Sequence, residues 1–197
     1  NSHKTNSKLW ITYSGLFYEF ITPKYFLKAF KKLTVERPDV AENIELHFAG
    51  FLRNENRKLI KKLNLQEFVK EYGYLDHNEN IKKIMSADIL WLMVGKGKNS
   101  DTVSSGKLYE YFGARKPIIA CLPDGSLKTA AEEYRAAFIV DPYDIDEIKN
   151  IFIKVYELYK SKQLPVPDEE FISRHRRDFL TEQLSKQFLF LVKEGVN

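Results

Sequence analysis

The segment from residue 104 to residue 110 places a candidate anion site beside a carboxylate. A polar stretch ends at Ser104, and a predicted helix begins at Ser105 or Gly106. The free amides and the positive dipole end of a helix N-terminus bind phosphate well. Lys107 would add a positive charge, and Glu110, one turn further along, could accept hydrogen bonds from ribose hydroxyls. This spacing indicates a diphosphate site with a ribose contact, and the alternative is a capped helix with a surface pair of Lys107 and Glu110.

Glycines follow three successive predicted strands, at Gly15, Gly50 and Gly73. A glycine at the end of a strand lets the backbone approach a ligand closely, although a tight turn also needs glycine. Parallel sheets bind ligands beyond the carboxyl ends of their strands. Three glycines in succession therefore favour a ligand site along this edge.

The elements that must position these residues alternate between short β-rich runs and helical stretches. This pattern predicts an α/β, Rossmann-like three-layer domain, with a parallel sheet of about six strands and helices on both faces. The nearly continuous apolar run at Asp88–Val94 is typical of a strand that is covered on both faces. The predicted strands are Leu9–Ser14, Ile44–Ala49, Phe68–Tyr72, Asp88–Val94, Pro117–Leu122 and Ala137–Val140.

Helices are predicted between these strands. The first should begin at Pro23 with Thr22 as its N-cap, and the third should begin with Asn78 as a cap. After the first helix, the predicted helices are Asn54–Leu63, Asn78–Met85, the segment from 105 or 106 to Ala114, Gly125–Ala136 and Ile145–Tyr159.

The chain divides into three predicted parts. Residues 1–8 are typical of a tag or linker, residues 9–162 form the α/β domain, and residues 163–197 form a C-terminal helical tail. Two prolines, Pro165 and Pro167, make a stiff break in the chain near the start of the tail. One or two tail helices should present an apolar stripe, formed by Phe179, Leu180, Leu184, Phe188 and Leu191.

Composition limits the class of function. The net charge is +4, and no basic block carries regularly spaced aromatic residues, so a nucleic-acid partner is not expected. The single cysteine, Cys121, and four scattered histidines indicate no disulfide and no metal site. No apolar run reaches the roughly 18 residues of a membrane span. We expect a cytoplasmic protein, and clusters of Lys and Arg leave open peripheral contact with the inner face of a membrane.

A family resemblance becomes specific at Lys107–Ala120, KLYEYFGARKPIIA. This run resembles the S-K-x-x-E-Y-x-A-x-x-K-P form of the signature of GT-B retaining glycosyltransferases of family 4. Residues 13–15, 46–50, 72–75 and 86–90 resemble the family's opening glycine turn, its next two strand ends and the strand before the donor loop. The resemblance covers Leu9 to Tyr159 and implies half of a GT-B fold, the half that binds a nucleotide-sugar.

The resemblance also implies roles for individual residues. Gly15 and Leu16 would lie near the diphosphate, together with the amides of residues 104–107, while Tyr74 and Leu75 would border the base. Glu110 would bind the ribose of the donor. A hexosyltransferase of this kind uses no metal cofactor, its most common donor is a UDP-sugar, and its acceptor is a glycan or a lipid-linked sugar. The N-terminal acceptor domain would be the missing partner, and the present chain would be inactive alone.

Three positions depart from the family pattern. Thr102 stands where many members carry a first Glu, Leu16 follows Gly15 where many carry Arg, and Lys24 is only an approximate substitute for a later Lys. Stabilisation of the diphosphate would then depend on Lys107, or on Lys96 and Lys98 in the polar loop. Two other classes stay open. A GT-B-like nucleotide-sugar epimerase would need further acid and base groups, and a receiver-like α/β module would need clustered acidic residues at the strand ends.

Overall fold

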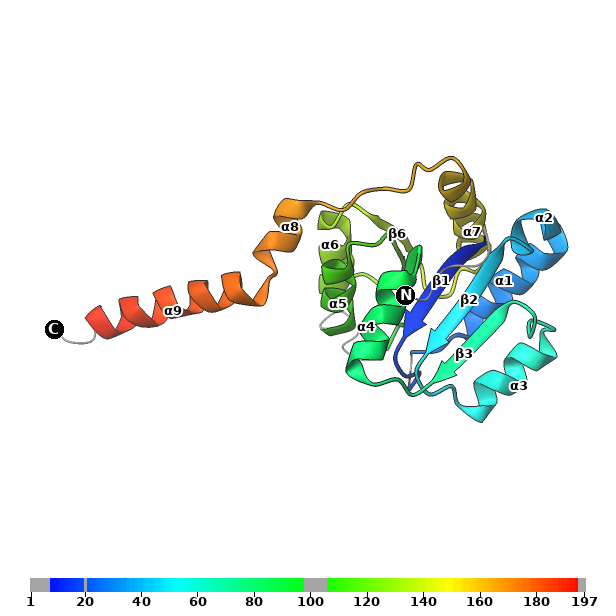
Figure 1. Ribbon diagram of the computed structural model, residues 1–197, viewed down its shortest axis with the longest axis horizontal. Coiled ribbons are helices and arrows are strands. Elements are labelled where there is room, and N and C mark those ends of the chain that lie inside the picture. The colour runs from blue at the N-terminus through cyan, green and yellow to red at the C-terminus, as the bar shows by residue number, and fades with distance from the viewer. Residues whose placement is uncertain (1–7, 20, 98–105, 195–197) are drawn as a thin grey trace.

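Six parallel strands form one sheet, and the structure, a computed structural model, describes residues 8–19, 21–97 and 106–194 (Figure 1). The strand order is β3-β2-β1-β4-β5-β6, so the chain builds outward from β1 and then crosses to β4 to build the second half. The boundary between β1 and β4 is therefore the topological switch point, where open α/β sheets bind ligands. The strands are β1 (Leu9–Ser14), β2 (Ile44–Ala49), β3 (Val69–Gly73), β4 (Ile89–Met93), β5 (Ile118–Cys121) and β6 (Ala137–Val140).

The predicted α/β fold with a six-stranded parallel sheet is confirmed. The bounds of β1, β2 and β6 agree with the prediction, and those of β3, β4 and β5 differ by one residue at each end. The helices are α1 (Lys24–Glu36), α2 (Pro38–Ala41), α3 (Asn54–Lys62), α4 (His77–Ser86), α5 (Gly106–Ala114), α6 (Ser126–Glu133), α7 (Ile145–Lys160), α8 (Glu169–Arg174) and α9 (Arg177–Glu194).

The predicted starts of α1, α4 and α6 differ from the structure by one residue. Helix α4 begins at His77 because Asp76, and not Asn78, is its N-cap, with the Asp76 carboxylate accepting a hydrogen bond from the amide of Glu79 at 2.9 Å. Helix α1 begins at Lys24 after Pro23, one residue later than predicted. The Thr22 hydroxyl oxygen accepts a hydrogen bond from the amide of Lys24 at 3.3 Å, as expected of the predicted cap.

Two further differences concern helix ends and a short helix. Helix α6 ends at Glu133 and not at Ala136, because Arg135 adopts a positive φ of 60° that no helix tolerates. The four-residue helix α2 was not predicted.

Helices cover both faces of the sheet, as predicted. On one face α1, α3 and α7 pack on alternate strand residues that include Ile89, Trp91 and Met93. On the other face α5, α6 and α8 pack on the intervening residues Leu90 and Leu92. Strand β4 is therefore buried on both sides, which explains its nearly continuous apolar sequence.

The C-terminal helix α9 extends away from the sheet (Figure 1). All its described side chains from Arg177 to Val192 are exposed. The predicted stripe is part of a wider apolar surface, because Leu189, Phe190 and Val192 are exposed as well. By contrast, α8 packs on the domain through the buried side chains of Phe171 and Ile172. Among the described residues, no helix has the length and apolar character needed to cross a bilayer.

Phe26 provides a test of the larger core. Its ring stacks on Trp91 with 3.6 Å between ring centroids, packs edge-on against Phe152, and is 1% exposed. We expect Phe26→Ala to lower the free energy of unfolding by about 3–5 kcal/mol, because it removes apolar burial and leaves a cavity. Chemical denaturation measures this change. Val35→Ala, on the same helix at a 70% exposed position, should change it by less than about 0.5 kcal/mol, and equal losses would contradict the packing described.

Candidate functional site

Three glycine turns meet at the carboxyl edge of β1, β2 and β3. The amide of Gly15 donates to the carbonyl of Ala49 at 2.7 Å, and the amide of Gly50 donates to the carbonyl of Gly73 at 2.8 Å. All three glycines have positive φ angles, of 131°, 130° and 68° in chain order. A Cβ on Gly50 would lie 2.3 Å from the carbonyl oxygen of Gly15. The prediction that these residues lie along one edge is therefore confirmed, and the close approach of Gly50 to Gly15 requires glycine at position 50.

Lys107 reaches across the switch point to the first of these turns. Its Nζ donates to the Tyr13 hydroxyl at 3.0 Å and lies 4.4 Å from the centroid of that ring. A Cβ on Gly15 would lie only 2.2 Å from the same Nζ. The ammonium group therefore rests directly on the Gly15 turn, in the space that a side chain at residue 15 would take.

Burial changes the charge properties of this group. Desolvation lowers the pKa of Lys107 to about 8, and the charge of Glu110 opposes this shift. Burial also raises the pKa of Tyr13, so its hydroxyl stays protonated and can donate to the Leu16 carbonyl at 3.0 Å while accepting from Lys107. Desolvation therefore disfavours the charged form of the Lys107 ammonium, and a bound anion would stabilise that form.

Tyr111 holds helix α5 in the position that this contact needs. Its buried hydroxyl accepts a hydrogen bond from the amide of Ser14 at 2.9 Å. Leu108 and Phe112 of the same helix are buried in the second core cluster. Because Tyr111 lies four residues after Lys107, both side chains lie on one face of α5, directed towards the end of β1.

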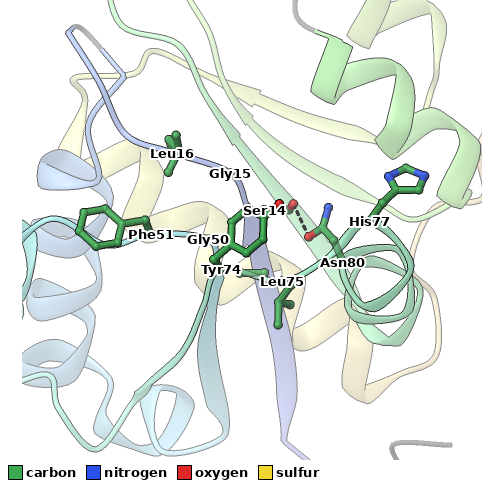
Figure 2. Close-up of a pocket in the computed structure, with 10 residues that line it drawn as sticks. Ser14, Gly15, Leu16, Gly50, Phe51, Tyr74, Leu75, His77 and Asn80 are labelled. Carbon is green, nitrogen blue, oxygen red and sulfur yellow. Dashed lines mark hydrogen bonds between the residues drawn. The ribbon is translucent and has the colours of Figure 1, made fainter.

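A cavity of about 300 Å³ opens beside the glycine turns (Figure 2). Two exposed aromatic rings stand at its walls, Phe51 at 55% and Tyr74 at 88% exposure. The Ser14 hydroxyl donates to Asn80 Oδ1 at 2.7 Å within this lining, as the dashed line in Figure 2 shows. The lining consists of Ser14, Gly15, Leu16, Ala49, Gly50, Phe51, Tyr74, Leu75, His77 and Asn80.

Four of the predicted donor-site residues line this cavity: Gly15, Leu16, Tyr74 and Leu75. Sequence reasoning missed Phe51, His77 and Asn80. Phe51 could have been found because it directly follows Gly50, whereas the two α4 residues required the true start of that helix. Glu110 is exposed on α5 near Lys107.

Two other candidate phosphate contacts, Lys24 and Lys96, are not among the residues that line this cavity. Lys24 is exposed at the first residue of α1, with its Nζ 5.4 Å from the centroid of the Tyr25 ring. Lys96 forms an ion pair with Asp141 at 2.5 Å, and its backbone amide donates to the Tyr143 hydroxyl. Lys96 lines a separate polar cavity of about 400 Å³. Lys98, Thr102, Ser104 and Ser105 lie outside the described residues.

Within residues 8–19, 21–97 and 106–194, no cluster of three or more His, Cys, Asp or Glu side chains could hold a metal ion. The described part of the site instead offers the ammonium of Lys107 and backbone amides. These groups bind anions and hydrogen-bond acceptors.

The glycine turns give a prediction with an internal control. Gly50→Ala should destabilise the protein more than Gly73→Ala does, because the new Cβ would clash with the backbone of Gly15. Gly73 has no neighbouring atom within 4 Å of its hypothetical Cβ, so its substitution costs only left-handed strain of about 1–2 kcal/mol. Melting temperatures of the two variants measure the difference. If Gly50→Ala were as stable as Gly73→Ala, the Gly50 turn would not be in close contact with the Gly15 backbone.

Comparison with known proteins places the chain in a family. The model of the family described as "Glycosyl transferases group 1" matches residues 1–165. No curated protein matches the sequence significantly.

Solved structures show the same fold at low sequence identity. A glycosyltransferase from Rickettsia africae superposes with a TM-score of 0.72 at 12% identity, covering 95% of this chain and 49% of that one. HepE from Anabaena, solved with UDP and glucose, gives 0.68 at 15% identity, covering 92% and 48%. The pneumococcal O-GlcNAc transferase GtfA, solved with UDP and GlcNAc, gives 0.64 at 14% identity, covering 100% and 38%.

The chain thus spans half or less of the length of these structures. The superposition on these structures is consistent with the fold described above, a parallel sheet with helices on both faces. The predicted resemblance to GT-B glycosyltransferases is confirmed. The chain belongs to the group 1 glycosyl transferases, and its fold is that of one half of a GT-B enzyme.

Proposed function

We propose that this chain is the donor-binding half of a retaining glycosyltransferase and that its donor is a UDP-sugar. The observation that supports this most directly is the position of Lys107, whose partly buried ammonium lies on the Gly15 turn at the switch point of the sheet. Family membership supplies the reaction class. The solved complexes of HepE and GtfA with UDP, which share the fold, support the choice of nucleotide.

The electrostatics of Lys107 favour a diphosphate ligand. Among the described residues no carboxylate forms an ion pair with its ammonium, so its charge is compensated only by the more distant Glu110. A phosphate at the Gly15 turn would supply the missing counter-charge in a partly desolvated place, where such pairing is strong. The same ammonium could stabilise the negative charge that develops on the leaving nucleoside diphosphate as its bond to the sugar breaks.

The cavity suits the nucleoside part of the same ligand. Tyr74 and Leu75 would border the base, as the family resemblance implies, and Phe51 adds a second aromatic surface. Aromatic walls with few polar groups are typical of pockets that hold flat rings. Glu110, exposed and one turn after Lys107, would accept hydrogen bonds from the ribose hydroxyls.

The rest of the enzyme would supply the acceptor site. The chain corresponds to about half of the Rickettsia africae and Anabaena structures, which is consistent with a partner domain outside this sequence. In this proposal the acceptor is a glycan or a lipid-linked sugar, and the protein acts in the cytoplasm, with peripheral contact at the inner face of the membrane. The transfer reaction would then need both halves, with the donor bound by this one.

The charge of Lys107 predicts a pH-dependent affinity for UDP. Its pKa of about 8 means that the ammonium is mostly charged at pH 7 and mostly neutral at pH 9.5. The terminal phosphate loses its last proton near pH 6, so the ligand's charge is constant across this range. We expect UDP to bind about ten- to 25-fold more weakly at pH 9.5 than at pH 7.5, because the charged fraction of Lys107 falls by at most about 25-fold and a charge-assisted hydrogen bond is lost with it. Isothermal titration calorimetry at both values measures the ratio.

Two variants make this measurement specific. Lys107→Met should bind UDP weakly at both pH values and show little dependence on pH. Lys154→Met removes an exposed lysine of α7, far along the chain from the site, and should keep the wild-type affinity and its pH dependence. UDP affinity unchanged by Lys107→Met would remove this residue from the binding site.

The role of Glu110 predicts a preference for ribose over deoxyribose. The wild type should bind UDP about tenfold more tightly than 2′-deoxy-UDP, because the carboxylate gains a hydrogen bond from the 2′-hydroxyl. Glu110→Gln should reduce this ratio towards one. The matched control is Glu133→Gln, an exposed position at the end of α6. A ratio that stays the same in Glu110→Gln would place the ribose elsewhere.

A further inference from the structure

The side-chain amide of Asn80 is anchored at the wall of the cavity through its Oδ1. The Ser14 hydroxyl donates to its Oδ1 at 2.7 Å, so the carbonyl end of the amide is already occupied. No described residue accepts a hydrogen bond from Nδ2. Asn80 lines the cavity and is only partly buried, so Nδ2 is the group that it can offer to a ligand.

Both partners in this contact belong to rigid elements. Ser14 ends β1, is 4% exposed, and is fixed through its backbone amide by the Tyr111 hydroxyl. Asn80 lies near the start of α4, where its backbone amide donates to the Asp76 carbonyl at 2.9 Å. A polar group on such a support can discriminate between ligands, since it cannot easily turn to suit the wrong one.

The surroundings of Asn80 select the kind of ligand atom that it would meet. The cavity is walled by the rings of Phe51 and Tyr74, and no Lys, Arg, Asp or Glu is among the residues that line it. Lys107 stands outside this lining, at the Gly15 turn. The cavity is therefore suited to a neutral, flat ring, and the fixed N–H of Asn80 is suited to a carbonyl oxygen on the edge of that ring.

We propose that Asn80 is a specificity-determining residue, which donates from Nδ2 to the 4-carbonyl of uracil and so selects against cytosine. This inference rests on the proposed function, since it assumes that the cavity holds the base of a nucleoside diphosphate. Cytosine carries an amino group at the same position. The 4-amino group of cytosine would face the Nδ2 donor, so neither N–H would have a hydrogen-bond acceptor. Two unpaired donors lower the affinity for cytosine by more than the loss of one favourable contact.

Asn80→Asp inverts this arrangement while keeping the side-chain shape. The Ser14 hydroxyl can donate to a carboxylate oxygen as it does to the amide oxygen, so the anchor is retained. The second atom changes from a donor to an acceptor. It would then repel the 4-carbonyl of uracil and accept from the 4-amino group of cytosine.

The experiment compares the Kd of UDP with that of CDP for three proteins by isothermal titration calorimetry. The wild type should favour UDP by about tenfold. Asn80→Asp should abolish or reverse this preference. Asn78→Asp, an exposed position on the same helix outside the cavity lining, makes the same change of charge and should keep the wild-type ratio.

Each failure has its own meaning. A wild type that binds neither nucleotide overturns the proposed function itself. Equal affinities for UDP and CDP, or an Asn80→Asp protein that weakens both by the same factor, overturns only the role of Asn80, because the amide would then contact a part that both ligands share. If circular dichroism shows that Asn80→Asp does not fold, the same comparison is made with Ser14→Ala. Freeing the amide to rotate should lower the UDP preference, and an unchanged preference would overturn the proposal.

Discussion

The contact between the Gly15 turn and its two neighbours constrains the whole carboxyl edge of the sheet. Gly50 approaches the Gly15 carbonyl so closely that a Cβ would lie 2.3 Å away, and Lys107 fills the space where a Gly15 side chain would stand. The turn is therefore surrounded by backbone on one side and by an ammonium on the other. The position of the Lys107 ammonium follows from this arrangement, because the charge reaches the turn when α5 is held against the end of β1.

That position depends on packing far from the ligand. The buried ring of Tyr111 joins α5 to Ser14, and α8 closes the same apolar cluster from the C-terminal side through Phe171. The other half of the domain is stabilised by an aromatic cluster around Trp91, against which Phe26 and Tyr13 pack. Tyr13 thus belongs to the core through its ring and to the site through its hydroxyl. Tyr13 therefore connects the core around Trp91 to the Lys107 ammonium.

The molecule has an asymmetric surface. The cavity at the glycine turns combines aromatic walls with a fixed amide, and Lys107 adds a positive charge beside it. Helix α9, in contrast, presents apolar side chains to solvent along its described length. A helix that is apolar around much of its surface is normally buried. This agrees with a chain that spans about half the length of the structures that it resembles.

Sequence alone determined the fold class, the six parallel strands and the edge of the sheet where the glycine turns meet, because hydrophobic periodicity and glycine punctuation are local properties of the chain. It also identified Gly15, Tyr74, Lys107 and Glu110 as candidates. Tertiary structure decided which lysine reaches the first turn: Lys107 lies on Gly15, whereas Lys96 is paired with Asp141. It also placed Asn80 beside Ser14, 66 positions apart in the chain. Such pairings depend on how β1, α4 and α5 pack together, and residue spacing within one element contains no information about the distance between two.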